Sequence, residues 1–178
     1  MKKIIWICGV IGGIISISWC IFSMQVFKTD MSMNQRLFFG YASMVLAFSL
    51  IFVAIKNFRD NYNDGIISFG KAIKIGLLIT AVASTVYVGV WLVDYYFFIP
   101  DYLDKYAAAM LTDLKAKHAS QAVITEQMAE AAKYAKMYKN PLFNALLTYT
   151  EIVPVGVVIS LIAALILYRK AKPTTINA

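Results

Sequence analysis

One uncharged segment constrains the fold of this chain more than any other feature of its sequence. Residues 75–93 carry no charge, Lys71 and Lys74 precede them, and Asp94 and a run of aromatic residues follow. A helix of this length, rising about 1.5 Å per residue, spans roughly 28 Å, close to the ~30 Å hydrocarbon core of a bilayer. Aromatic side chains favour the membrane–water interface, and Pro100 ends the helical pattern. The segment therefore predicts a membrane-spanning helix.

Three further segments have the length and the apolar composition of a membrane span. Of the 178 residues, 60% are hydrophobic and 15% are charged, whereas soluble domains have about a quarter charged residues. The first segment is expected to be an uncleaved span rather than a signal peptide, because its apolar run continues through Phe22. Lys56 and Arg59 are expected to end the second span. The predicted spans are residues 4–27, 37–55, 70–98 and 142–168.

Residues 101–140 differ in composition from the predicted spans. They hold five acids and six lysines among many alanines, which is too polar for the bilayer but suits a helix. Apolar residues recur at helical spacing from Leu103 to Leu114, and a second, weaker stripe follows Thr125, the expected N-cap of a second helix. These residues are expected to form a helical hairpin. Whether it is a plain connector or a partner-binding surface stays open.

The fold class follows from the spans and the hairpin together. We predict an all-α chain with a single membrane domain, residues 1–178. In it, an integral membrane four-helix bundle carries an extracytoplasmic helical hairpin between the third and fourth spans. Lys and Arg residues are densest near the helix ends on the side of both termini, which favours cytoplasmic termini.

Small residues at four-residue spacing mark two candidate faces for helix packing. Gly9 and Gly13 form one in the first span, and Gly156, Ser160 and Ala164 form the other in the fourth. Small side chains let helix backbones approach closely in a membrane, where lipid supplies no hydrophobic drive for association. We expect both faces to be buried at helix–helix contacts, either within one chain or between chains.

Two acids, Asp94 and Glu151, lie closest to the bilayer and are the candidate functional polar residues. Counted from Lys74 and Arg169, both are expected near the outer boundary of the hydrocarbon. Ionisable groups there are costly and often functional. Each acid either reaches water separately, or the two face one another as a cation or proton site. Glu151 is the better candidate because it is deeper and lies beside Pro154.

The sequence gives no sign of catalytic, cofactor or metal chemistry. It has no phosphate-binding loop, no dinucleotide fingerprint and no nucleophile elbow. Cys8 and Cys20 would lie roughly 18 Å apart on one helix, too far for a disulfide, and His118 is the only histidine. Positive charge is spread over every polar segment, so no nucleic-acid partner is expected. We expect neither an enzyme nor a bound cofactor.

Three stretches of the sequence together resemble a known family. They are DGIISFGKAIKIGLLIT, WLVDYYFFIPDYLDKY and KNPLFNALLTYTEIVPVGVVISLIAALIL. Their most recognisable residues are Gly65, Ser68, Phe69, Gly70, Pro100, Asp101, Glu151, Pro154 and Gly156. The set resembles small bacterial four-span membrane proteins grouped as domain of unknown function 4199. This resemblance implies an architecture and a place in the bacterial inner (cytoplasmic) membrane, but no activity.

Two classes of function remain after these exclusions. The first is a structural or accessory membrane protein, which needs packed helices and a docking surface. The second is a small oligomeric transporter or ion-conducting protein with an acidic site at its outer mouth, which needs polar groups along a path. The expected partners are the lipid bilayer and either another membrane protein or further copies of this chain.

Overall fold

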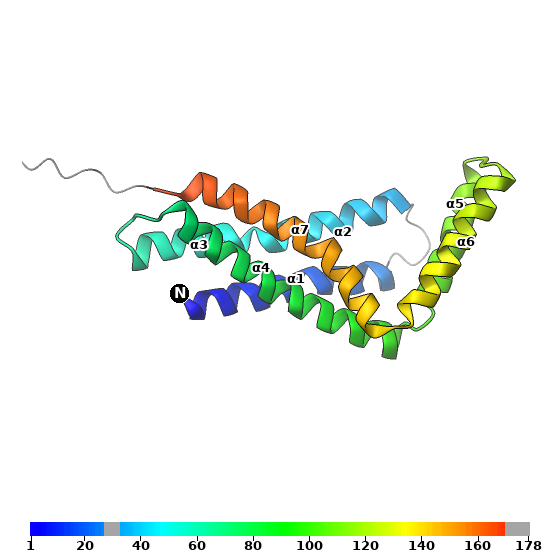
Figure 1. The fold of residues 1–178 in the computed structure, drawn as a ribbon, viewed down its shortest axis with the longest axis horizontal. Coiled ribbons are helices and arrows are strands. Elements are labelled where there is room, and N and C mark those ends of the chain that lie inside the picture. The colour runs from blue at the N-terminus through cyan, green and yellow to red at the C-terminus, as the bar shows by residue number, and fades with distance from the viewer. Residues whose placement is uncertain (27–32, 170–178) are drawn as a thin grey trace, which may run out of the picture.

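The computed structural model describes residues 1–26 and 33–169, and this part of the chain is all-α (Figure 1). Four helical stretches are long and apolar enough to cross a membrane. The predicted all-α fold with four apolar helices is confirmed, and the chain is a multi-pass membrane protein. The helices are α1 (Lys2–Val26), α2 (Met33–Phe48), α3 (Leu50–Tyr62), α4 (Phe69–Val93), the π-helical turn η1 (Asp94–Phe98), α5 (Tyr102–Ala116), α6 (Gln121–Tyr138) and α7 (Pro141–Leu167).

Helix α4 is the central element of the bundle, because α1 and α7 both pack along it. It starts after a turn in which Asp64 and Gly65 both have positive φ, as the Asp-Gly sequence predicts. The Ser68 side chain caps α4 by accepting a hydrogen bond from the Lys71 backbone N–H at 3.3 Å. The start of α1 and the end of α7 lie at one end of the bundle, opposite the hairpin (Figure 1).

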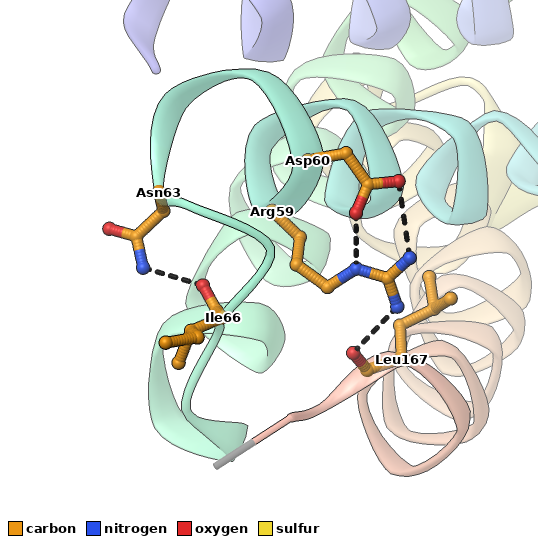
Figure 2. A network of polar contacts seen from close by, with 5 residues as sticks. All are labelled: Arg59, Asp60, Asn63, Ile66 and Leu167. Atoms are coloured by element: carbon orange, nitrogen blue, oxygen red, sulfur yellow. Dashed lines mark hydrogen bonds and ion pairs between the residues drawn. The ribbon is translucent and has the colours of Figure 1, made fainter. Parts of the chain in front are cut away.

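The helical stretch that contains the second span is longer than the predicted span. It consists of α2 and α3, separated at Ser49, and it continues to Tyr62, past Lys56 and Arg59. The Arg59 guanidinium pairs with Asp60 at 2.6 Å and donates to the Leu167 carbonyl at 3.3 Å (Figure 2). The arginine therefore ties the end of α3 to the end of α7.

A backbone bridge aligns the ends of α4 and α7. The Ile67 N–H donates to the Arg169 carbonyl at 3.1 Å, and the Arg169 N–H donates to the Ile67 carbonyl at 2.8 Å. Ile67 is fully buried beneath this bridge. Arg169 therefore lies level with Ile67, two positions before α4 begins and seven positions before Lys74.

The predicted small-residue faces lie where α1 and α7 approach α4. A Cβ added to Gly13 would lie 2.7 Å from the Ala83 carbonyl oxygen, and one added to Gly9 would lie 2.6 Å from Val82 Cγ1. On the other side of α4, a Cβ added to Gly156 would clash with the Thr80 side chain. Ser160 and Ala164 are fully buried in the same interface. Larger side chains at these positions would push the helices apart.

Helices α5 and α6 pack against each other as a hairpin across one end of the bundle (Figure 1). Neither helix contains a fully buried residue. The N-cap of α6 is Ser120 rather than the predicted Thr125, whose hydroxyl instead donates to the Gln121 carbonyl within the helix. The start of α7 agrees with the sequence, because the Asn140 side chain accepts from the Leu142 N–H at 2.9 Å.

An aromatic cluster joins the hairpin to the ends of α4 and α7. The Tyr96 hydroxyl donates to the Tyr138 carbonyl at 2.8 Å, and the Tyr95 and Tyr138 ring centroids are 5.8 Å apart. The Trp91 ring meets Tyr102 edge-on at 5.2 Å. Burial raises the pKa of the Tyr138 hydroxyl to about 12, and the charge of Glu151 adds to this effect. The hairpin is therefore held where the long helices end.

Glycine substitutions test the close packing around α4. We expect Gly13→Ala and Gly156→Ala to lower the free energy of unfolding by about 1–3 kcal/mol, because the added methyl overpacks the interface. Thermal aggregation of the purified protein in mild detergent measures the change. Gly89→Ala is the matched control, because Gly89 lies in α4 itself but a Cβ added there would have no atom within 4 Å beyond its own helix backbone and its chain neighbours. Equal stability of all three variants would show that α1 and α7 do not approach α4 this closely.

Candidate functional site

Side-chain hydrogen bonds set the register between α4 and α7, which run antiparallel. The Trp91 indole N–H donates to Asn144 Oδ1 at 3.1 Å, and the Tyr149 hydroxyl donates to Thr85 Oγ1 at 3.1 Å. Nearer the bridge between Ile67 and Arg169, the Thr80 and Ser160 hydroxyls are 3.3 Å apart. With these pairs in place, the backbone of Glu151 lies at about the level of Ser84.

This register places the backbone of Glu151 near the middle of the membrane span. Ser84 is ten residues from Lys74 and ten from Asp94, which is about 15 Å in each direction along a helix. The hydrocarbon core is ~30 Å thick, so Glu151 begins near its midplane. The expectation of a position near the outer boundary is wrong for Glu151. That expectation counted Arg169 as level with Lys74, whereas the bridge places Arg169 level with Ile67, further from the hairpin.

The structure does not bring the two candidate acids together. Asp94 stands at the start of η1 and is half-buried, whereas Glu151 is exposed on α7. Their backbones are about 15 Å apart along the bundle, too far for two carboxyls to share a cation or a proton. The paired site that the sequence left open is therefore not formed within one chain.

Glu151 lies on the flank of α7 that faces α2, at the end of an apolar cleft nearer the hairpin. The cleft has a volume of about 300 Å³ and is lined by Val45, Pro154, Val155, Val158 and Ile159. Val155 and Val158 follow Glu151 by four and seven positions, so all three share one side of the helix. In the described residues, no group forms a hydrogen bond or an ion pair with Glu151. The site is thus an exposed carboxyl above an apolar groove.

A seam of buried polar side chains between α4 and α7 was not anticipated from the sequence. Asn144 and Thr148 are buried one turn apart, and the Thr148 hydroxyl donates to the Asn144 carbonyl at 2.8 Å. The Ser160 hydroxyl donates to the Gly156 carbonyl at 2.7 Å. Polar residues at four-residue spacing in an apolar span are the signal that could have revealed this seam.

Two atoms of the seam have no partner among the described residues. They are Ser84 Oγ and Asn144 Nδ2, and both residues are fully buried. A buried polar atom without a hydrogen bond costs free energy, more so in a membrane. The other polar side chains of the seam form hydrogen bonds either between α4 and α7 or within one helix.

The family-like motif residues do not converge on one site. Ser68 caps α4, Gly65 has a φ of +74°, and Phe69 and Gly70 are exposed at the start of that helix. At the other end of the bundle, Asp101 pairs with Lys105 at 2.7 Å, and this lysine holds the pKa of Asp101 below its usual range. The motif thus marks turns and helix ends, together with the cleft residue Pro154.

The described residues give no candidate metal centre. No group of three His, Cys, Asp or Glu side chains among them is placed to hold a metal ion. His118 lies at an exposed turn with a φ of +53°, and Cys8 is a buried free thiol in α1. The side chain of Cys20 lies outside the described part of the chain. The site therefore consists of Glu151, the cleft and the polar seam.

The comparisons with known proteins agree with the resemblance seen in the sequence. A family model described as "Protein of unknown function (DUF4199)" matches residues 7–169, which is most of the chain. No curated protein and no solved structure matches the chain. The family match supports the architecture and assigns no activity.

Proposed function

We propose that this chain, which belongs to the DUF4199 family of proteins of unknown function, is a structural or accessory protein of the bacterial inner membrane. The observation that carries the proposal is the exposure of Glu151, which lies on the cleft side of α7 and forms no hydrogen bond or ion pair within the described residues. Ionisable residues within membrane spans almost always face a partner group or a water-filled cavity. An exposed acid at this depth therefore favours a partner in the membrane.

The packing of the bundle also supports an accessory role. Around α4, the helices meet through Gly9, Gly13 and Gly156, at positions where even a methyl group would clash. Such direct contact between backbones leaves no room for a solute path between these helices. We further propose that the chain is not an enzyme and binds no cofactor. Glu151 has no hydrogen-bonded second group, in the described residues, that could serve as an acid, a base or a nucleophile.

One observation favours the second candidate, a small oligomeric transporter or ion-conducting protein. Ser84 Oγ at mid-depth and Asn144 Nδ2, which lies closer to the hairpin, are buried without a hydrogen-bond partner among the described residues. Unpaired polar groups at this depth are typical of proteins that pass water or ions across a membrane. In this alternative, several copies would place their Glu151 side chains around a shared path. The acidic site would then lie at mid-depth rather than at the outer mouth.

Copurification and flux assays distinguish the two candidates. The tagged full-length chain, isolated from its native membranes in mild detergent, should retain another membrane protein at a fixed ratio. The same protein alone, reconstituted into vesicles, should move no Na⁺, K⁺ or protons above the background of empty vesicles. A cation flux by the purified chain that is lost in Glu151→Gln would contradict the accessory role and support the transporter.

We also propose that both termini are cytoplasmic and that the hairpin of α5 and α6 is extracytoplasmic. The support is the charge near three helix ends: Lys2 and Lys3 start α1, Arg59 lies near the end of α3, and Lys71 and Lys74 lie in the first turns of α4. These helix ends lie at the end of the bundle opposite the hairpin (Figure 1). Positive residues near span ends are retained on the cytoplasmic side.

Reporter fusions measure this orientation. A periplasmic reporter should be active when it is inserted at Ser120, in the turn of the hairpin, and inactive when it is fused after Ala178. A cytoplasmic reporter should give the opposite pattern at the two positions. The reverse result for both reporters would invert the proposed orientation and leave the fold unaffected.

A further inference from the structure

We infer that the cleft between α2 and α7 docks a membrane-spanning helix of another protein, and that this helix carries a lysine or an arginine near mid-depth that pairs with Glu151. The inference rests on the proposed accessory function and names the chemistry of the partner. It is carried by the depth of Glu151, the charge of this chain and the shape of the cleft.

The depth of Glu151 requires a partner for its carboxyl. Its backbone lies at the level of Ser84, and its exposed side chain would meet lipid chains in an isolated bundle. Helix side chains lean toward the N-terminus, so the carboxyl points into the outer half of the core. In that position the Glu151 carboxyl is close enough to the Tyr138 hydroxyl for its charge to raise the pKa of that hydroxyl. A charged group in this region is costly unless another charge or a hydrogen-bond donor meets it.

The sequence excludes a second copy as the source of a cation at this depth. Residues 4–26, 37–55, 75–98 and 141–168 contain no Lys, Arg or His. The basic residues of the inner ends, such as Lys71 and Lys74, lie about 15 Å or more from the level of Glu151 along the bundle. The complementary charge must therefore come from a different chain. Lys and Arg are the side chains that pair with a carboxylate through charge-assisted hydrogen bonds.

The cleft gives a docking helix an apolar contact surface next to the Glu151 carboxyl. Its lining comes from two helices, with Val45 on α2 and Pro154, Val155, Val158 and Ile159 on α7. Val45 is 48% exposed and Val158 is 53% exposed, so these side chains are open to a neighbour. A volume of about 300 Å³ is enough for apolar side chains of a docking helix to enter between α2 and α7. A helix seated there would place a residue one or two turns away beside Glu151.

Model helices of defined sequence test this pairing. The full-length protein, with a donor fluorophore at its C-terminal end, is reconstituted in phosphatidylcholine vesicles with acceptor-labelled leucine–alanine helices of about twenty residues. One peptide carries a central lysine, a second carries leucine at that position, and a third carries the lysine at its end. Energy transfer at increasing peptide-to-protein ratios gives the relative affinity of each peptide.

The central-lysine peptide should bind the wild-type protein about tenfold more tightly than the other two peptides. Glu151→Gln should remove this preference, and Asp94→Asn should retain it. Val158→Trp fills the cleft and leaves the carboxyl in place, so it should weaken binding of the central-lysine peptide. Leu165→Trp is its control, because Leu165 is 60% exposed on α7 but does not line the cleft.

Equal binding of the lysine and leucine peptides to the wild-type protein would overturn the inference. So would a lysine preference that survives in Glu151→Gln. Energy transfer between two labelled copies of the chain that is lost in Glu151→Gln, without any peptide preference, would make a second copy the occupant instead. A native partner that copurifies equally well with Glu151→Gln would reject only this pairing. Cation flux by the chain alone would reject the accessory function itself.

Discussion

The close approach of α4 to α1 and α7 is the constraint on which the rest of this structure depends. Lipid chains are as apolar as the helix surfaces, so helices in a membrane associate through direct packing and hydrogen bonds. Here Gly13 and Gly156 allow the contact, and the pair of Trp91 and Asn144 aligns the helices along their length. That alignment sets the depth of every side chain on α7. Because of this alignment, Glu151 lies near the midplane of the span and not at the interface, where the sequence alone placed it.

The spans and the fold class could be predicted because they depend on local composition and length. The end of the second helical stretch could not, because α3 continues past its charged residues and Arg59 finds partners there. They are Asp60 beside it and the Leu167 carbonyl, which is distant in sequence. The prediction of Thr125 as the N-cap of α6 was wrong for a local reason. Ser120 and Thr125 are both good caps, and sequence does not say which hydroxyl is free to accept the N–H.

Glu151 and the small-residue faces could be predicted from the sequence, whereas the polar seam and the geometry of the site could not. Small residues at four-residue spacing indicate close contact because the contact depends only on side-chain size. The separation of Asp94 and Glu151 depends instead on the register between two helices, which is set by long-range pairs such as Ile67 with Arg169. The cleft beside Val45 arises from how α2 lies against α7. No spacing within either helix encodes it.

The depth of residue 151 is the most direct test of this account. In a background in which Cys8 and Cys20 are replaced by serine, a fluorophore is attached at Glu151→Cys or at Asp94→Cys, and quenching by brominated lipids is measured in vesicles. The label at 151 should be quenched most by bromines deep in the acyl chains, and the label at 94 by quenchers at the headgroups. Headgroup-level quenching at both positions would contradict the register between α4 and α7.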